Sequence, residues 1–271
     1  MIKKNLLKIG EFIPSPLKEA VTYGFSTRHG GVSPTPFNSL NLGTNTDDTP
    51  LNITENRKLL AKSYNFDPEK LLTIKQVHGN KVLDLTEAAG DYSGFEADVI
   101  ITKLRNIPIG ILSADCLPVL LFDPVTKTIG AVHCGWRGTN ACVIIETTKA
   151  MEQLYGSEPK DILAVLGPHI GPCCFKVGEV VINGFKETCK NLKNNYNIKT
   201  SDNIFGTEDG ELWFDLGRAN RLLLTQAGLR EENIAFEFAC TSCNNADYFS
   251  YRKENGITGR QIGLIMLKGE S

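Results

Sequence analysis

The sequence predicts an α+β fold in which a mostly antiparallel β-sheet core is flanked by helices. Short runs rich in β-branched and aromatic residues outnumber the helical segments, and the two do not alternate strictly, as a doubly wound fold would require. Hydrophobic residues make up 41% and charged residues 22% of the 271 positions, which suits a globular core. Because no low-complexity linker divides the chain, we expect residues 1–271 to form a single domain.

The predicted strands are short, and their Val, Ile, Phe and Tyr content fits pleated, half-buried surfaces. Two segments rich in turn-forming residues, 78–80 and 123–127, are predicted to join neighbouring strands as hairpins. In chain order the predicted strands are residues 21–26, 71–77, 81–85, 98–102, 108–112, 119–123, 128–132, 162–166, 211–214, 234–239, 248–251 and 262–267.

Fewer segments have the apolar spacing of amphipathic helices. Asp215 is a suitable N-cap, and Gly156 and Gly228 follow two predicted helix ends, where glycine is favoured. The apolar stripe of the second helix includes Leu154, which we expect to be buried. The predicted helices are residues 50–64, 139–155, 178–189 and 215–227.

The charge balance argues against a nucleic-acid binder held by phosphate contacts. The chain carries 29 Lys and Arg against 31 Asp and Glu, a formal net charge of −2, and no run of five like charges. Anionic small molecules remain candidate partners, because two well-placed arginines do not require a basic protein.

Neither a secretory signal nor a membrane span is expected. Lys8 and Glu11 interrupt the N-terminal apolar stretch. The best candidate for a span, residues 107–122, contains Asp115 and falls short of the roughly 18 apolar residues that a membrane helix needs. We therefore expect a cytoplasmic protein whose eight cysteines are reduced thiols or metal ligands.

Three potential metal ligands lie at the ends of different apolar runs. His78 and His133 each end one run, and Cys116 follows another. If the three runs are strands of one sheet, these side chains can converge at one rim. Two histidines and one cysteine suit a catalytic zinc site, which keeps a fourth position open for water or substrate. Such a zinc lowers the pKa of its bound water to about 7.

The spacing of these ligands leaves a second interpretation open. His78 and Cys116 are 38 positions apart, and Cys116 and His133 are 17 apart, which matches no zinc-finger pattern. The histidines could instead close strand ends, with Cys116 packed as a small apolar residue. Dispersed ligands carry no local signature that distinguishes the two interpretations.

The remaining cysteines show no zinc pattern of their own. Cys240 and Cys243 form one C-x-x-C, and two thiols alone do not make a structural zinc site, so a packed pair is expected. The vicinal residues 173–174 end a tight Gly/Pro loop that we expect to line a pocket. The other three, Cys134, Cys142 and Cys189, are expected in the core.

Two arginines are candidates for anion binding. Arg28 ends a predicted strand before a glycine pair, and Arg137 immediately precedes a predicted helix, where free backbone N–H groups also favour phosphate. A solvated charge or a local ion pair is the alternative for each. No G-x-x-x-x-G-K-[ST], G-x-G-x-x-G or G-x-S-x-G occurs, so P-loop, dinucleotide and serine-hydrolase functions have no motif support.

Ten segments of the chain resemble the laccase-domain family, also called polyphenol oxidoreductase or YfiH-type proteins and regarded as purine nucleoside phosphorylases. The resemblance covers residues 23–267 in the order of the family. The matching segments are residues 26–33 (STRHGGVS), 39–43 (SLNLG), 76–79 (QVHG), 114–118 (ADCLP), 132–138 (VHCGWRG), 166–175 (LGPHIGPCCF), 215–216 (DL), 240–243 (CTSC), 249–252 (FSYR) and 259–263 (GRQIG).

This resemblance implies a zinc ion held by His78, Cys116 and His133, three residues that would also be catalytic. It implies phosphorolysis of adenosine, inosine, guanosine and methylthioadenosine with inorganic phosphate, and adenosine deamination as a second activity. Arg28 matches an arginine that the family needs for activity. The preferred nucleoside and the oligomeric state, monomer or dimer, are left open.

The laccase label itself is not expected to describe the main activity. Four histidines in total cannot supply a histidine-rich trinuclear copper cluster. An axial methionine for a lone blue-copper site is also missing, because Met1, Met151 and Met266 are far from the ligands in sequence. Incidental copper binding at the zinc ligands remains open.

Two other functions stay as alternatives. A cysteine hydrolase or transamidase would use Cys116 as nucleophile and His133 as base. A zinc-stabilised interaction module would instead need a closed site with a fourth ligand such as His169. For any proton transfer, Asp115 is the carboxylate nearest to the ligands in sequence.

Overall fold

The computed structural model describes residues 6–7, 19–87, 90, 92, 94–192, 202–236 and 239–269. Its centre is a six-stranded sheet with the order β11-β8-β6-β7-β4-β3, antiparallel except at the two outer pairs. Its strands are β3 (Val82–Leu85), β4 (Val99–Thr102), β6 (Leu117–Asp123), β7 (Thr128–Cys134), β8 (Leu163–Leu166) and β11 (Ile234–Phe236).

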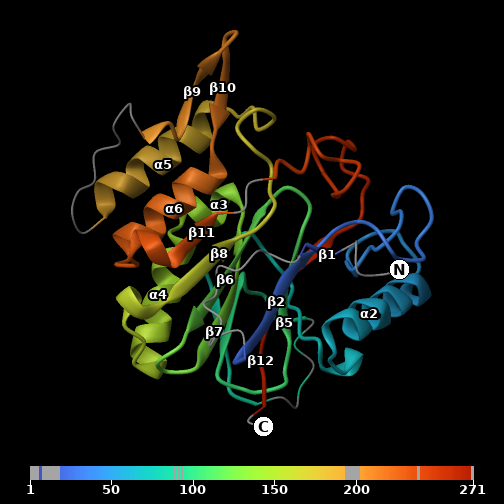
Figure 1. The fold of residues 1–271 in the computed structure, drawn as a ribbon. Coiled ribbons are helices and arrows are strands. Elements are labelled where there is room, and N and C mark those ends of the chain that lie inside the picture. The colour runs from blue at the N-terminus through green and yellow to red at the C-terminus, as the bar shows by residue number, and fades with distance from the viewer. Residues whose placement is uncertain are drawn as a thin grey trace.

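A second sheet packs against one face of the first (Figure 1). All of its pairs are antiparallel, and its order is β1-β2-β12-β5. A separate hairpin of two strands projects from the helical side (Figure 1). These strands are β1 (Leu6–Leu7), β2 (Val21–Ser26), β5 (Ile109–Ser113), β9 (Phe205–Glu208), β10 (Glu211–Phe214) and β12 (Gln261–Leu267).

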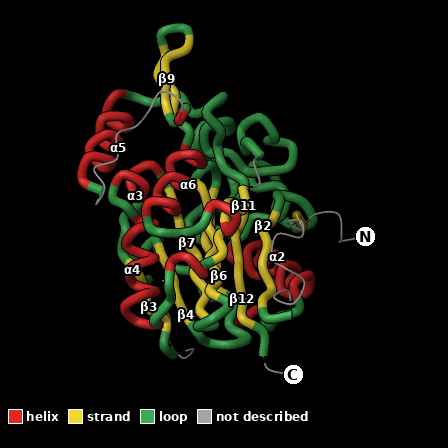
Figure 2. The backbone as a smooth tube through the Cα atoms, turned by 60° about the vertical axis from the view of Figure 1, so that its left-hand side comes forward, coloured by secondary structure: helices red, strands yellow, loops and turns green. Residues whose placement is uncertain are grey.

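Helices cover the other face of the six-stranded sheet. Figure 2 shows α3, α4, α5 and α6 together on one side of the strands, while α2 lies on the opposite side of the molecule. The helices are α2 (Pro50–Tyr64), α3 (Trp136–Asn140), α4 (Val143–Tyr155), α5 (Glu179–Asn191) and α6 (Leu216–Gln226), with short 3₁₀ turns η2 (Pro68–Lys70), η3 (Pro159–Asp161) and η5 (Glu231–Asn233). None of the helices in the described residues is long and apolar enough to span a membrane.

The central strands are buried on both faces, which explains their nearly continuous apolar sequences. Along β6, Val119 and Leu121 point to the helices, whereas Leu120 and Phe122 point to the second sheet. The molecule therefore has three layers, with the six-stranded sheet between the helices and the second sheet. One hydrophobic core lies on each face of the six-stranded sheet. The predicted α+β class with mostly antiparallel pairing is confirmed.

Local signals explain the elements that were predicted most accurately. Thr49 caps α2 by accepting from the Asn52 N–H, and Asp215 caps α6 in the same way. Gly156 ends α4 with a positive φ of 72°. The turn at residues 123–127 joins β6 and β7 in a true hairpin, as predicted.

Two predicted strands are absent because glutamine side chains replace the backbone ladder. Residues 71–77 make only isolated bridges, and the Gln76 amide bonds both the N–H and the C=O of Leu112. Residues 248–250 have no regular structure and Tyr251 begins a turn, while the Gln261 amide bonds both backbone groups of Phe249. With no strand before it, the predicted hairpin turn at residues 78–80 is wrong.

The remaining differences are smaller. The helix predicted at 139–155 is two helices, since Cys142 between them adopts a left-handed φ of 60°. Leu154 is 54% exposed rather than buried. Strand β9 was not predicted, and the predicted strand at 234–239 ends at Phe236, with residues 237–238 outside the described part of the chain.

Candidate metal centre and its cavity

The three predicted metal ligands lie together at one end of the central sheet. Cys116 immediately precedes β6 and His133 is near the end of β7, and the pairing of Pro118 with His133 brings the two side chains together. The ligand atoms of His78, Cys116 and His133 all lie within 4.8 Å of one another. The sequence therefore predicted correctly that these side chains converge at one rim of the sheet.

The buried carboxylate of Asp98 orients two of these ligands. It accepts from His133 Nδ1 at 2.7 Å and from the backbone N–H groups of His78 at 2.9 Å and Gly79 at 2.7 Å. Because Nδ1 of His133 is committed to the carboxylate, Nε2 is the nitrogen left for a metal. The same carboxylate fixes the loop that presents His78. Asp98 was predicted only as the start of a strand, and a single acidic residue before an apolar run carries no signal for this role.

The protonation states of Cys116 and His133 depend on each other at the ligand cluster. Burial alone would raise the pKa of the Cys116 thiol, but the adjacent His133 and His78 side chains outweigh it and lower that pKa to about 6. Burial alone would lower the pKa of His133, but the Cys116 thiolate and the Asp98 carboxylate raise it to about 9. At neutral pH without metal, the two side chains therefore form a thiolate–imidazolium pair.

Gly135 leaves the space in which the ligands meet. A Cβ atom at this position would lie 3.0 Å from Cδ2 of His78 and 3.2 Å from Sγ of Cys116. The φ of Gly135 is −77°, so its backbone does not require glycine. Space beside the ligands, rather than conformational freedom, explains the glycine.

The ligand cluster opens into a cavity of about 530 Å³. Apolar and aromatic walls are supplied by Trp136, Phe175 and Tyr251 among others. Among the described residues, five cationic side chains line the cavity, against a single carboxylate, that of Asp115. Both oxygens of this carboxylate already accept hydrogen bonds, one from Thr241 Oγ1 and one from the Arg252 N–H. The five cations are Arg57, Lys75, Arg137, Arg252 and Arg260.

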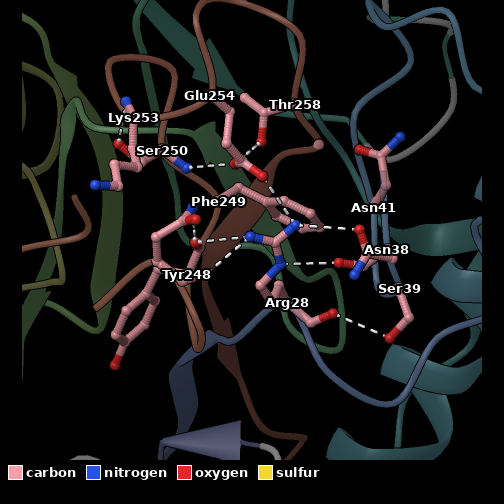
Figure 3. Close-up of polar contacts among 12 residues, drawn as sticks. Arg28, Asn38, Ser39, Asn41, Tyr248, Phe249, Ser250, Lys253, Glu254 and Thr258 are labelled. Atoms are coloured by element: carbon pink, nitrogen blue, oxygen red, sulfur yellow. Dashed lines mark hydrogen bonds and ion pairs between the residues drawn. The ribbon is translucent and has the colours of Figure 1, made fainter. Parts of the chain in front are cut away.

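The two predicted anion-binding arginines have different locations. Arg137 lines the cavity, and its guanidinium stacks on Trp136 at 4.5 Å from the ring centroid. Arg28 is not among the cavity-lining residues and is 6% exposed. Figure 3 shows its guanidinium surrounded by acceptors of the protein itself. The structure therefore brings Arg137, but not Arg28, to the cavity that contains the ligand cluster.

All three nitrogens of the Arg28 guanidinium have protein partners. Nε donates to the Asn38 carbonyl at 2.8 Å, Nη1 to the Asn245 carbonyl at 2.8 Å, and Nη2 to the Glu254 carboxylate at 3.1 Å (Figure 3). The guanidinium also lies 4.6 Å from the ring centroid of Phe249. These contacts join Asn38 to the segment 245–254, which carries the cavity-lining residues Tyr251 and Arg252.

The other histidines and cysteines are outside the ligand cluster. His169 is not part of the His78 group, so the described residues offer three ligands there and no closed set of four. The Gly/Pro loop that ends at Cys173 and Cys174 lines the cavity through Ile170, as expected, and Phe175 lines it as well, although the two cysteines themselves do not. Three further cysteines were predicted in the core: Cys134 and Cys189 are buried, whereas Cys142 is half-buried.

This fold and this ligand cluster place the chain in a known class. It belongs to the family described as multi-copper polyphenol oxidoreductase laccase, whose model matches residues 22–268. The chain is 32% identical over 260 residues to the purine nucleoside phosphorylase YlmD of Bacillus subtilis, covering 93% of this chain and 90% of that protein. It is 36% identical over 252 residues to the purine nucleoside phosphorylase YfiH of Escherichia coli, covering 93% and 96%.

Solved structures agree with this assignment. The crystal structure of the hypothetical protein YfiH of Bacillus licheniformis matches with a TM-score of 0.87 at 33% identity and covers 97% of each chain. That of YlmD from Geobacillus stearothermophilus gives the same TM-score at 29% identity. The family resemblance inferred from the sequence motifs is confirmed.

Proposed function

We propose that this protein is a zinc-dependent purine nucleoside phosphorylase. The observation that carries the proposal is the joining of an open three-ligand cluster to a cavity with five cations and aromatic walls. The cations suit inorganic phosphate, and the aromatic walls suit a purine. The names of the relatives from Bacillus subtilis and Escherichia coli support the same activity.

The residues present fit a zinc ion at the ligand cluster. One thiolate and two imidazoles are the donor types that zinc prefers, and three protein ligands leave one position free. Nδ1 of His133 is oriented by a carboxylate, as is usual for a zinc-bound histidine. A zinc ion held by His78, Cys116 and His133 would supply Lewis acidity at the wall of the cavity.

The cavity side chains would do the remaining work of phosphorolysis. Arg137, Arg252 and Arg260 would bind phosphate and hold it against C1′ of the ribose, where loss of the purine leaves an oxocarbenium-like centre. Trp136 and Phe175 would stack against the base and exclude water from the reacting bond. We propose adenosine, inosine, guanosine and methylthioadenosine as substrates, with adenosine deamination as a second activity.

Laccase chemistry is not part of this proposal, although the family name includes it. Only His78 and His133 of the four histidines lie in the cluster, and no methionine lines the cavity in the described part of the chain. A multicopper oxidase needs many more histidines, and a blue-copper site has a weak axial ligand that is usually methionine. Incidental copper binding to the same three ligands remains compatible with the donor set.

A cysteine hydrolase or transamidase is the second candidate, because one observation favours it. Cys116, whose pKa is lowered to about 6, lies beside His133, whose pKa is raised to about 9, which is the charge state of an activated cysteine nucleophile. The interaction-module alternative has no comparable support, since His169 does not join the ligand cluster.

Incubation of the zinc-loaded protein with adenosine, inosine and phosphate tests the proposal. The expected products are ribose-1-phosphate and free base, with inosine from adenosine as the sign of deamination. The Cys116→Ala variant should lose activity together with the zinc ion of the His78, Cys116 and His133 cluster, whereas the Cys142→Ala control should keep both. A folded, inactive Cys116→Ala protein with full zinc occupancy would favour the nucleophile instead. Absence of ribose-1-phosphate from the wild type would refute the phosphorylase.

The same assay tests the role assigned to the cavity arginines. Loss of one charged phosphate contact in Arg137→Ala should lower kcat/KM for phosphate by about thirty- to a thousand-fold, equivalent to roughly 2–4 kcal/mol. Arg221 on α6 is outside the cavity lining, so Arg221→Ala is the matched control and should leave this parameter unchanged. Equal effects of the two substitutions would contradict the assignment.

Two broader expectations belong to the same proposal. We propose that residues 1–271 act as one domain, which the match to the family over residues 22–268 supports. We also propose a cytoplasmic location, which the eight free thiols support, because reduced cysteines persist in that compartment.

A further inference from the structure

Four cysteines gather at a second place on the molecule. Cys173, Cys174, Cys240 and Cys243 have Sγ atoms that all lie within 4.8 Å of one another. Cys243 is 3.5 Å from Cys173 and 3.4 Å from Cys174, measured between Sγ atoms. None of the four is in a disulfide. We refer to these residues as the thiol quartet.

The spacing of the quartet suits a single tetrahedral ion. With a Zn–S distance of about 2.3 Å, the sulfur atoms of a zinc tetrathiolate lie about 3.8 Å apart by simple geometry. The separations in the structure are compatible with this value, at 3.4 and 3.5 Å for two pairs and no more than 4.8 Å for the others. A disulfide would need sulfur atoms about 2.05 Å apart.

Backbone groups around the quartet are arranged as in thiolate metal sites. The Gly171 N–H donates to Sγ of Cys240 at 3.3 Å, and the Cys243 N–H faces the same sulfur. Such N–H groups stabilise a metal-bound thiolate. The Asn244 N–H donates to the Cys240 carbonyl at 2.9 Å, which closes the C-x-x-C segment into a turn that points both thiols the same way.

The quartet joins two loops that are far apart in sequence. Cys173 and Cys174 follow β8, whereas Cys240 and Cys243 follow β11, and a bridge between His169 and Cys240 holds the loops side by side. In Figure 1 both loops lie at the end of the sheets nearest the β9–β10 hairpin. Each loop also supplies walls of the cavity, Phe175 from the first and residues 251–252 from the second.

We propose that the thiol quartet binds a second zinc ion, which is structural and separate from the ion at His78. Four thiolates close the coordination sphere and leave no position for substrate. The ion would clamp the two loops beneath the cavity wall, where Arg252 already donates to the Cys174 carbonyl at 3.0 Å and the Lys176 carbonyl at 3.1 Å. This zinc ion is inferred independently of the proposed phosphorylase activity.

Zinc content of the full-length protein, measured by elemental analysis after metal-replete expression, tests the proposal. We expect two zinc ions in the wild type, one in Cys116→Ser and one in the double variant Cys173→Ser/Cys243→Ser. The matched control Cys142→Ser should retain two. The proposal is overturned if the double variant keeps as much zinc as the wild type, or if Cys116→Ser contains none.

A second measurement covers the case in which the double variant fails to fold. Cobalt(II) added to the metal-free Cys116→Ser protein should give intense sulfur-to-metal charge-transfer bands, and zinc should abolish them. The exposed thiols of Cys173 and Cys243 should react with a thiol reagent only after zinc is removed. The proposal is overturned if these bands are absent or if the thiols react equally with and without zinc. It is also overturned if the quartet binds iron in place of zinc, or forms a disulfide after isolation under reductant.

Discussion

Replacement of Asp98 by asparagine should loosen the metal centre while leaving the fold intact. The carboxylate accepts from Nδ1 of His133 and the His78 N–H through one oxygen, and from the N–H groups of Gly79 and Val77 through the other. Asparagine has nearly the same shape but replaces one acceptor oxygen by an NH₂ donor. That donor must face either the imidazole and the His78 N–H or the other two N–H groups.

The size of the effect follows from these contacts. When the NH₂ group faces Val77 and Gly79, their two N–H groups lose their acceptor at about 1–3 kcal/mol each. The lower values apply because Val77 is exposed and Gly79 half-buried, so the unfolding free energy should fall by about 2–3 kcal/mol. The oxygen that still accepts from His133 Nδ1 then belongs to a neutral amide, a weaker partner than the carboxylate. Such a change at the orienting partner of a metal-bound histidine weakens metal binding about 10- to 100-fold, or roughly 1.4–2.7 kcal/mol. The affinity of the centre for zinc should therefore fall by about one to two orders of magnitude.

Competition with a chelator of known zinc affinity measures this change, and denaturant unfolding of the metal-free protein measures stability. Asp123→Asn is the matched control, because Asp123 is equally buried and accepts from the Val125 and Thr126 N–H groups at the far end of the same sheet. It should lose stability but keep its zinc affinity. An Asp98→Asn protein that binds zinc within about twofold of the wild type would refute the orienting role.

Three further predictions concern the same region. Gly135→Ala should weaken zinc binding about tenfold or more while the chain still folds. Gly178→Ala is the control and should bind zinc as the wild type does, because a Cβ atom there would meet nothing within 4 Å. Equal zinc affinities of the two variants would contradict the steric argument. Arg28→Ala should lower the free energy of unfolding by about 3–5 kcal/mol without changing zinc content, measured by denaturant titration. Unchanged stability together with a raised KM for phosphate would instead assign Arg28 to the anion. In the Cys173→Ser/Cys243→Ser variant, which keeps only the His78 site, zinc binding near pH 7.5 should release about one proton, because His133, with a pKa of about 9, must lose its proton whereas Cys116, with a pKa of about 6, is already ionised. Calorimetry in two buffers of different ionisation enthalpy measures this proton, and no buffer dependence would contradict the charge state.

The parts of the fold that were predicted from sequence are those with local signals. Helix α2 follows a capping Thr49, and the β6–β7 hairpin follows from turn residues between two apolar runs. The failures have a physical cause in distant partners. Gln76 and Gln261 each hold an extended segment through a side-chain amide, and no periodicity in the sequence distinguishes such a segment from a strand.

Some residues of the candidate site were also predictable from the sequence, and others were not. Its ligands were predictable because each ends an apolar run, and antiparallel neighbours bring such ends together. Asp98 was not, because its hydrogen-bond partners on two other segments are invisible in the sequence. The quartet was missed because residues 173–174 and 240–243 were judged separately, and only the fold brings two pairs of thiols to one place. The sequence motif identified Arg28 as a candidate anion ligand, but it could not show that the guanidinium points to acceptors of the protein itself.

The β6–β7 hairpin also sets an order in which the centre is assembled. Cys116 and His133 belong to one continuous piece of chain, and a hairpin forms within microseconds. His78 joins them only after β4 has paired with β7 and brought Asp98 beside the loop. A nascent chain therefore presents two ligands early and the complete set of three only when the sheet is built. If the centre holds the proposed zinc ion, that ion would stabilise only the finished fold, and metal availability would then affect how much folded protein a cell retains.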